Sequence, residues 1–434
     1  MQISAITWQN LLLQTDEIII KLFAGNRKKG FFEMIFDYQK KYDIAISGAG
    51  IAGISAALAA ARRGHKVVLL EKQTLIGGLA TSGLIYIYLP LCDGNGTQVS
   101  FGITEELLRI STEFSPFDIP EKWNGPAKSR ALQQERYQCE FSPAGFILSL
   151  DKLLRNAGVD LWLDTRVCAV QKASDGKIIA LEVENCSGRG RIAAGYFVDA
   201  TGDATLIRRS GGKTETDENT HSLWMIQTSP EEKKPFPFTD SINIAPFGGK
   251  KVEGDARDAK VHSTFIRESW NTAREYYKYA YDSGKSSRYN HYPLHLPAMV
   301  QLRKIACING VESLDSESEW KHYDSSVGLY ADWRGCGMVY ETPYGSLIPA
   351  DVRGVFAAGR CISTKGEAWE AYRVIPAAAM TGEIAGVGAS LAVERKCDAL
   401  DLSPEDLRRE LRKNNFKFHF EEVGLDPAQY KKEK

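Results

Sequence analysis

The chain has 434 residues, enough for two or three domains, and its 43% hydrophobic and 25% charged residues are typical of a soluble globular protein. A formal net charge of −1 excludes the strong basic character by which proteins bind nucleic acid or an anionic membrane. The eight cysteines form no C-x-x-C pair and no zinc-like spacing with histidine. They predict free thiols in a reducing, cytoplasmic compartment and no metal site.

The first 40 residues are predicted to be an N-terminal extension without a catalytic role. Residues 8–23 have the pattern of an amphipathic helix. Asp16, Glu17 and Lys21 interrupt its apolar run, so we expect no signal peptide.

Residues 42–72 carry the pattern of a dinucleotide-binding strand–helix–strand unit. The apolar run 42–47 predicts a buried parallel strand, and the Ala- and Leu-rich run 51–63 predicts the helix that follows. A second apolar strand is predicted at 66–70, with Glu71 at its end. This order of strand, glycine loop, helix, strand and acid is much more specific than a glycine motif alone.

Three glycines in the loop have the spacing G-x-G-x-x-G, and each has a physical role. Gly48 lets the chain turn sharply, Gly50 lets the backbone approach a pyrophosphate, and Gly53 lets helix and strand pack closely. The free N–H groups at the helix N-terminus then face the phosphates. Glu71, 18 residues after Gly53, can accept hydrogen bonds from ribose hydroxyls, and its charge argues against NADP. The motif leaves FAD and NAD open.

The middle of the chain predicts a helix followed by an antiparallel meander. Ser142-Pro143 supplies an N-cap and a first-turn proline for a helix that runs to about residue 156. Strand-like runs at 161–173, 177–184 and 191–198 are separated by turn residues. The last run leads into Ala200-Thr201-Gly202, a turn at the carboxyl end of a buried strand, where parallel sheets bind ligands.

Residues 214–340 differ in composition from the rest. They are polar and aromatic, with a Lys/Pro-rich loop at 231–237 and a predicted helix at 265–282. We interpret them as an inserted domain that covers the ligand. A buried strand at 354–358, followed by Gly359-Arg360, then returns to the nucleotide-binding domain.

A long helix is predicted at 375–394. The apolar run 374–393 is long enough to cross a membrane, but it is rich in Ala and Gly rather than Leu, and it contains Glu383. We therefore predict a buried core helix and no integral membrane segment.

Four blocks of the chain resemble the FAD-dependent oxidoreductases with a glutathione-reductase-like FAD domain, near the fumarate reductase/succinate dehydrogenase flavoproteins and the thiazole synthases. The blocks are residues 48–71, Gly77-Gly78 with Ala80-Thr81, residues 198–203 and residues 354–379. The resemblance covers about residues 40–395. It implies an α/β fold with a three-layer, Rossmann-like FAD/NAD(P)-binding domain, built from a parallel sheet plus a β-meander, and an inserted α+β cap domain.

The resemblance also implies the domain boundaries. We predict an N-terminal extension at 1–40, a discontinuous FAD-binding domain at 41–213 and 341–396, the inserted cap at 214–340 and a C-terminal helical tail at 397–434.

By this resemblance the cofactor is FAD, and its contacts can be assigned. Residues 48–53 would hold the pyrophosphate, Glu71 the adenosine ribose and Val167 the adenine. Gly359 and Arg360 would approach the ribityl chain. The flavin ring would lie at the N-terminus of the last long helix, whose dipole stabilises negative charge on the reduced flavin. The predicted FAD contacts are Gly48, Ala49, Gly50, Ile51, Ala52, Gly53, Glu71, Lys72, Gly78, Leu79, Ala80, Thr81, Arg166, Val167, Ala200, Thr201, Gly202, Gly359, Arg360, Arg373, Pro376, Ala378 and Ala379.

The chain departs from the better-known members of this group. The Arg/His constellation that fumarate reductases use for dicarboxylates is not recognisable, and residues 77–82 lack the cysteine pair of disulfide reductases. No second complete GxGxxG is present for a nicotinamide dinucleotide. These departures argue against a disulfide reductase and against a built-in nicotinamide site.

Three residues are candidates for catalysis. Arg373 would anchor a carboxylate or the flavin O2 atom, with a structural salt bridge as the alternative. Arg303 would contact the substrate or form a surface or interdomain ion pair. Glu367 would act as a base, although the preference of helix N-termini for negative charge also explains it.

The sequence thus predicts an FAD-dependent oxidoreductase that transfers a hydride between a small organic substrate and flavin N5, with an unidentified electron acceptor. Two alternatives are an FAD-dependent monooxygenase and a non-catalytic flavin-binding protein. The large insert favours an enzyme, because it would cover an otherwise open flavin. No nucleic-acid partner is expected, and homo-oligomer formation is left open.

Overall fold

The computed structural model describes residues 36–123, 136–229 and 242–430. The helix predicted at 8–23, nearly all of the N-terminal extension and the loop predicted at 231–237 lie outside the described residues.

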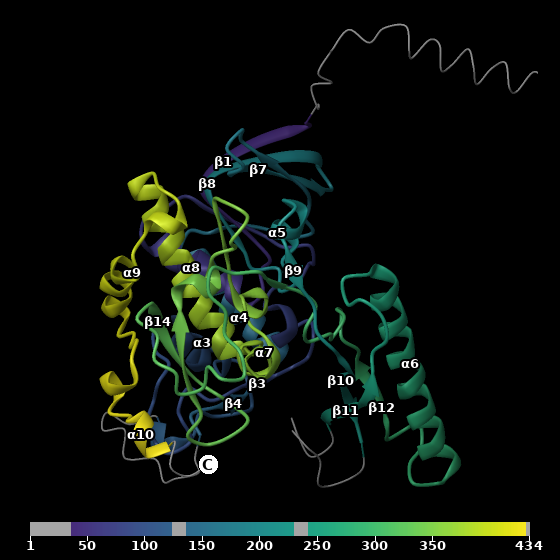
Figure 1. Ribbon diagram of the computed structural model, residues 1–434. Helices are drawn as coiled ribbons and strands as arrows, with labels where there is room; N and C mark the ends of the chain where they lie inside the picture. The colour runs from purple at the N-terminus through teal and green to yellow at the C-terminus, as the bar shows by residue number, and fades with distance from the viewer. Residues whose placement is uncertain (1–35, 124–135, 230–241, 431–434) are drawn as a thin grey trace, which may run out of the picture. The chain divides into compact units, whose positions relative to one another are not determined.

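A mostly parallel sheet forms the centre of the fold (Figure 1). Its strands run in the order β5-β2-β1-β8-β7-β6, and β16 pairs with β8. The parallel strands are β1 (Tyr38–Ser47), β2 (Val67–Leu70), β5 (Asp160–Trp162), β8 (Gly188–Asp199) and β16 (Val355–Ala357). Every residue of β2 and of β16 is buried, as expected of apolar strands that are covered on both faces. The predicted α/β fold class is confirmed.

The predicted meander is present, with one correction. Strands β6 (Arg166–Lys172), β7 (Ile178–Asn185) and β8 are antiparallel neighbours. The single strand predicted at 161–173 is wrong, because β5 ends at Trp162 and β6 starts a new direction. Asp164 adopts a left-handed φ of 47° between them, and backbone hydrogen bonds from Asp164 to Gln73 and from Thr165 to Glu71 fix that turn.

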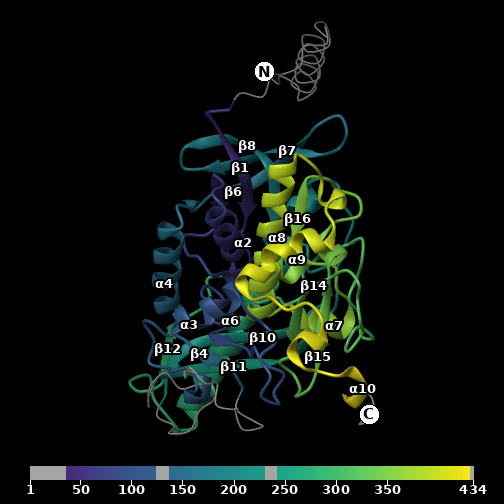
Figure 2. The same ribbon diagram turned by 90° about the vertical axis from the view of Figure 1, so that its left-hand side faces the viewer.

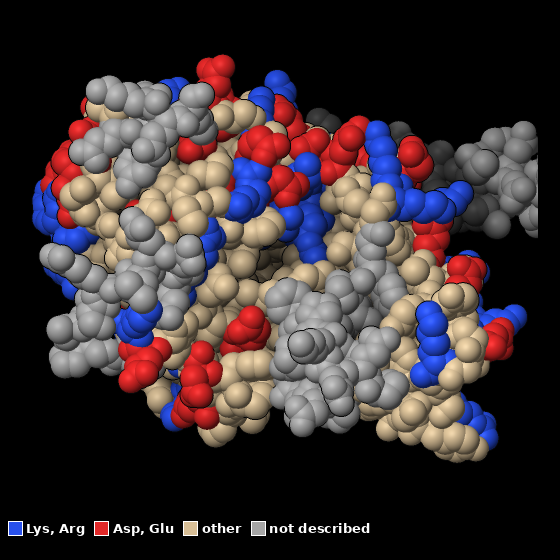
Figure 3. Space-filling view, turned by 90° about the horizontal axis from the view of Figure 1, so that it is seen from below, with Lys and Arg blue, Asp and Glu red and all other residues tan. Residues whose placement is uncertain are grey.

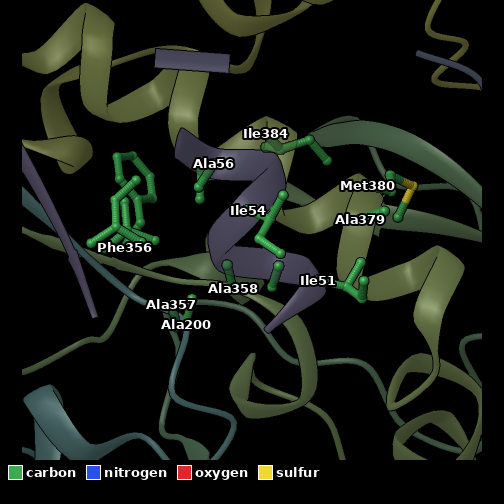
Figure 4. Close-up of a cluster of buried hydrophobic side chains, with 14 of the residues drawn as sticks. Ile51, Ile54, Ala56, Ala200, Phe356, Ala357, Ala358, Ala379, Met380 and Ile384 are labelled. Atoms are coloured by element: carbon green, nitrogen blue, oxygen red, sulfur yellow. The ribbon is translucent and has the colours of Figure 1, made fainter. Parts of the chain in front are cut away.

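Two helices pack closely on the sheet, as Figures 2 and 4 show: α2 (Ile51–Arg62) and α8 (Ile375–Arg395). A Cβ atom at Gly382 would lie 2.2 Å from the Ala52 carbonyl oxygen, and one at Gly386 would lie 2.4 Å from that of Ala56. Glycine is therefore required at both positions for the two backbones to approach this closely.

Among the described residues, α8 is the one helix long and apolar enough to cross a membrane, and 89% of its apolar window is buried inside the protein. This is the burial expected of a core helix.

The helix predicted to run to about residue 156 has the expected bounds, as α4 (Pro143–Asn156). The chain also forms α3 (Ile103–Ser111) and, within the predicted helical tail, α9 (Pro404–Leu411). The helix predicted at 265–282 begins earlier, as α6 (Ala259–Asp282), because the Asp258 carboxylate caps it by accepting from the Lys260 N–H. Short helices also form at α5 (Thr205–Arg209), α7 (Gly366–Tyr372) and α10 (Pro427–Tyr430).

Residues 214–343 contain three further sheets. Strands β10 (Thr220–Thr228), β11 (Ile242–Lys251) and β12 (Tyr292–His295) form a small sheet beside α6 (Figure 1). The hairpin of β14 (Ser326–Ala331) and β15 (Val339–Pro343) packs near α8 and α9 instead. The predicted 340/341 boundary falls within β15, and the division into domains stays a prediction. Two-residue strands pair as β3 (Ile87–Tyr88) with β4 (Cys139–Glu140) and β9 (Thr214–Glu215) with β13 (Cys307–Ile308).

The carboxyl group of Glu383 is buried in the middle of α8. One oxygen accepts from the Ile103 N–H at 2.7 Å and the other from the Asn414 side-chain amide at 2.6 Å. Burial raises the pKa of Glu383 from 4.5 to about 7. The residue therefore links α8 to the first turn of α3 and to the C-terminal tail.

Glu383 should make the stability of the protein depend on pH. Because the folded protein holds this proton more tightly than the unfolded chain does, the stabilising contribution is complete below pH 4.5 and is lost as the pH rises through 7. Relative to Glu383→Gln, the wild-type free energy of unfolding should fall by about 2–3 kcal/mol between about pH 5 and about pH 8. Urea unfolding of both proteins at both pH values measures this difference. An identical pH dependence of the two proteins would contradict the assignment.

Candidate functional site

A cavity of about 790 Å³ opens at the carboxyl ends of the parallel strands. Its wall includes Ser47 and Leu70, the last residues of β1 and β2, together with Ala200 after β8 and Ala358 after β16. Ligands bind at this edge of parallel sheets, and the volume is in the usual range for small-molecule sites. Figure 3 shows a hollow in the surface with basic side chains beside it.

The first turn of the cavity wall depends on two glycines. Gly48 has a φ of 96°, and a Cβ atom there would lie 2.6 Å from the Ala200 carbonyl oxygen. A Cβ atom at Gly53 would lie 1.8 Å from the Gly48 carbonyl oxygen. Gly53 therefore does not line the cavity but allows α2 to pack against the turn, as its position in the motif predicts.

The middle glycine of the motif faces open space. Apart from the backbone around residue 50 itself, no heavy atom of the described residues lies within 4 Å of a Cβ atom built on Gly50, and Gly50 lines the cavity. It is the N-cap of α2, and among the described residues no side chain caps that end. The first N–H groups of α2 are therefore available to an anion in the cavity.

Glu71 lines the cavity at the end of β2 and is 7% exposed. Its carboxylate accepts from the Ala49 N–H at 2.7 Å and from the Gln73 N–H at 2.9 Å. Burial raises its pKa despite these two hydrogen bonds. Ala49 is not part of the cavity wall. Its contribution to the site is the hydrogen bond that fixes the Glu71 carboxylate.

A second pair of glycines brings the backbone close to the first. Gly77 has a φ of 97°, and its N–H donates to the Ala49 carbonyl at 2.7 Å. A Cβ atom on Gly78 would lie 3.1 Å from the Gly50 Cα atom. The Thr81 hydroxyl bonds to the Ile76 carbonyl, so Thr81 braces this turn from outside the cavity wall.

Arg360 is buried where β8 and β16 end. Its Nε donates to the Gly202 carbonyl at 2.6 Å, and its Nη1 donates to the Leu302 carbonyl at 2.7 Å. Burial lowers the pKa of Arg360, although the nearby Asp203 carboxylate opposes that shift. The guanidinium therefore joins the loop after β8 to the loop that carries Arg303.

The N-terminus of α8 also reaches the cavity. Val374, its N-cap, lines the wall together with Ile375 and Ala378, and no side chain of the described residues caps this helix. Arg373 lines the cavity as well and pairs with Glu370 through Nε at 2.6 Å. Two predicted contacts, Pro376 and Ala379, are buried in the helix and lie outside the cavity wall.

The structure brings two of the three predicted catalytic residues together, Arg303 and Arg373, but of the three only Arg373 is part of the cavity wall. Arg303 lies close enough to Arg360 and Arg373 for their charges to affect it, and burial together with these charges lowers its pKa to about 9. Glu367 is different. Its carboxylate is 64% exposed, pairs with Arg334 and is not part of the cavity wall. This geometry gives no support to Glu367 as a base.

Of the 23 FAD contacts predicted from the sequence, 18 line the cavity. The structure adds residues that sequence reasoning missed. Arg208 and Arg209 from α5, Arg257, and His262 from α6 also form part of the wall, as does the segment 298–300. The basic pair at the end of α5 begins five residues after the 198–203 block and could have been suspected from its position. The others belong to the region of the chain with the weakest sequence pattern.

The residues of this cavity fit FAD. The space in front of Gly50, the uncapped N-termini of α2 and α8, and the acid after β2 match a long ligand with a pyrophosphate, an adenosine ribose and an anionic ring edge.

Comparison with known proteins decides the family. The family model described as FAD dependent oxidoreductase matches residues 43–309 and 310–411. The chain belongs to this family. It is an enzyme, an oxidoreductase whose cofactor is FAD.

Curated relatives match this flavoprotein over shorter spans. The thioredoxin reductase of Ureaplasma parvum is 34% identical over 73 residues, which is 17% of this chain and 24% of that protein. The digeranylgeranylglycerophospholipid reductase of Thermoplasma volcanium is 27% identical over 182 residues, 39% of this chain and 42% of that protein. The matches thus span less than half of either relative.

Solved structures of similar fold include a geranylgeranyl bacteriochlorophyll reductase-like protein from Thermoplasma acidophilum. It has a TM-score of 0.44 and 16% identity, with 87% of this chain and 84% of that chain covered. The flavin-dependent brominase Bmp2 has a TM-score of 0.45 and 13% identity, with coverages of 86% and 83%.

The glycine loop offers a clean test of the FAD site. Gly50→Val should fold, because the new side chain points into open space at a φ of −70° that valine adopts. It should lower FAD affinity at least about 100-fold, because the side chain occupies the approach to the pyrophosphate. Flavin absorbance after gel filtration, together with the thermal unfolding midpoint of the apoprotein, measures both effects.

Gly53→Ala is the matched comparison. It should destabilise the fold itself, because its Cβ atom would overlap the Gly48 carbonyl oxygen. Full FAD occupancy in Gly50→Val would contradict the assignment of the loop.

Proposed function

We propose that this flavoprotein transfers a hydride between FAD and a small organic substrate that carries a carboxylate or similar anionic group. The observation that supports the proposal is a cluster of three arginines: Arg360 and Arg373 line the cavity beside the N-terminus of α8. Arg303 is not part of the cavity wall but lies close enough to both for their charges to lower its pKa. Such a concentration of positive charge in a partly buried site favours an anionic ligand.

Two of these arginines already have partners. Arg360 donates to the carbonyls of Gly202 and Leu302, and Arg373 pairs with Glu370. Lys304 also contacts Glu370, at 3.2 Å, so the charge of that carboxylate is shared between two cations. Within this cluster the positive charge exceeds the negative charge.

Arg303 is the arginine left for an incoming anion. Among the described residues it forms no ion pair with a carboxylate, and its Nη1 donates to the Gln301 carbonyl at 3.0 Å. Burial and the two neighbouring arginines lower its pKa to about 9 although the Glu370 carboxylate opposes that shift, so the charge of Arg303 is only partly compensated. A substrate carboxylate would complete this compensation through a bidentate contact.

The segment that carries Arg303 is held rigidly. The Asn219 side-chain oxygen accepts from the N–H groups of Arg303 and Lys304, both at 2.9 Å. The Gln301 side chain accepts from the Trp224 N–H at 2.9 Å and donates to the Trp224 carbonyl at 3.0 Å. Fixed positions of this kind orient a substrate at little entropic cost.

Bound FAD supplies the hydride chemistry at its N5 atom. In the proposed reaction, Arg303 binds the anionic group of the substrate, and the segment 298–300 excludes water from one side of the cavity. Arg373 and the N-terminus of α8 hold negative charge near the flavin ring.

The substrate class can be tested by anaerobic mixing of the oxidised holoenzyme with carboxylic acids and with their neutral amides. We expect particular acids to bleach the visible flavin absorbance and the matching amides to fail. Arg303→Leu should keep FAD but lose about 100-fold or more in kcat/KM for the acid, equal to about 3 kcal/mol of transition-state binding. Arg155→Leu, which changes an arginine that is 77% exposed, should leave kcat/KM unchanged.

Two results would argue against this function. Equal bleaching by acids and amides would contradict the proposal that the substrate is anionic. Normal kinetics of Arg303→Leu would contradict the role of Arg303 in binding it. Incorporation of labelled oxygen from O₂ into the product, with NAD(P)H consumption and no anaerobic bleaching, would instead identify a monooxygenase.

A further inference from the structure

A group of three potential metal ligands lies away from the FAD cavity, where the C-terminal tail meets the β14–β15 hairpin. It comprises His322 from the loop before β14, Glu341 from β15 and His419 from the tail. One ligand atom from each residue lies within 4.8 Å of the other two. The three residues are 19 and 78 positions apart in sequence, so only the fold brings them together.

The side chain of Glu341 at the centre of this group is fully buried. Its Oε2 accepts from the Tyr323 N–H at 2.8 Å and lies 3.1 Å from His419 Nδ1, while its Oε1 lies 3.3 Å from His322 Nδ1. Contacts of 3.1–3.3 Å are longer than the ~2.7–2.9 Å of a hydrogen bond between an imidazolium and a carboxylate. A fully buried carboxylate is costly unless a positive charge compensates it closely.

The two ring nitrogens of His322 bear on which positive charge compensates the Glu341 carboxylate. Nδ1 faces Glu341 at 3.3 Å, and Nε2 faces the Asp324 carboxylate at the same distance. A neutral imidazole has one N–H, so it donates to one carboxylate and turns a lone pair toward the other. That conflict disappears in two ways: a protonated ring donates from both nitrogens, or Nε2–H donates to Asp324 while the Nδ1 lone pair binds a cation beside Glu341. Carboxylates often orient metal-bound histidines in this way.

We propose that His322, Glu341 and His419 bind a divalent transition-metal ion, with Zn²⁺ the best match. The ligands would be the two Nδ1 atoms and the Glu341 carboxylate, and two imidazoles with a carboxylate form a donor set that suits Zn²⁺. In a tetrahedral zinc site with bonds of ~2.0–2.1 Å, neighbouring ligand atoms are ~3.3 Å apart. His419 Nδ1 lies 3.1 Å from Oε2 of Glu341 and His322 Nδ1 lies 3.3 Å from Oε1, so each imidazole is near that spacing from one oxygen of the carboxylate. Because the three ligand atoms as a set lie within 4.8 Å of one another, the two imidazoles would move closer together when the ion binds. The side chain of His322 is 55% exposed, so water has access to the fourth position.

The ion would fasten the tail to the hairpin. His419 immediately precedes Phe420, whose ring packs 5.0 Å from that of Trp320 in a small apolar cluster separate from the main core. This apolar cluster packs the C-terminal tail against the rest of the folded protein. A metal ion bound beside it would stabilise the contact between tail and hairpin, because the ion binds only when both are in place.

Zinc binding to the full-length, FAD-loaded enzyme, freed of metal by chelator dialysis and carrying no histidine tag, tests the proposal. Calorimetric titration should give one Zn²⁺ per chain, and Co²⁺ should produce the visible absorption of a tetrahedral site. His322→Ala and His419→Ala should each weaken binding about 100-fold or more. Asp324→Asn should weaken it about 10-fold, because it loses the orienting carboxylate. His295→Ala, which changes an exposed histidine of β12, should leave the affinity within about 2-fold.

The thermal unfolding midpoint gives an independent readout. It should rise with Zn²⁺ in the wild type and in His295→Ala, and stay constant in His322→Ala. Equal zinc affinity in the wild type and His322→Ala would overturn the site. So would an unfolding midpoint that responds to pH but not to zinc, which would mean that protonated histidines alone balance Glu341.

Discussion

The close approach of the Gly48 carbonyl oxygen to α2 is the contact on which the site depends. Because Gly53 has no side chain, the Gly48 carbonyl oxygen can occupy the place where a Cβ atom would lie. The helix can therefore start directly above the end of β1. The same absence of side chains at Gly382 lets α8 lie against α2. Both helices therefore direct their N-termini toward one cavity, where their unpaired N–H groups and dipoles attract anions. In the predicted arrangement, the N-terminus of α2 would face the pyrophosphate and that of α8 the flavin end of the cofactor.

The second part of the site relies on charge. Arg303 comes from one part of the chain, and Arg360 and Arg373 come from another. Hydrogen bonds to backbone carbonyls hold Arg360 and Arg303 in place. Grouping like charges is unfavourable in a folded protein, and burial increases that cost, as the lowered pKa of Arg303 indicates. Such an arrangement is typical of a functional site, because an anionic ligand repays the cost.

Local patterns explain what could be predicted from the sequence. Single elements are encoded locally, by the glycine spacing, the Ser142-Pro143 cap and the apolar runs. The order of these elements along the chain allowed the fold to be predicted. Contacts between distant residues could not be derived in the same way. No local pattern indicates that Arg303 meets Arg360, or that His322, Glu341 and His419 meet at one point. The predicted strand at 161–173 failed for a related reason, because its break at Asp164 depends on hydrogen bonds to residues 71 and 73.

The central claim is that the cavity holds a dinucleotide, with its adenosine half bound by Glu71 and the N-terminus of α2. Fluorescence titration of the apoprotein with FAD, with FMN and with FAD in the presence of ADP tests it most directly. We predict that FAD binds at least about 100-fold more tightly than FMN and that ADP competes with FAD, since the adenosine and pyrophosphate contacts contribute several kcal/mol. Equal affinity for FAD and FMN, or no competition by ADP, would contradict the claim.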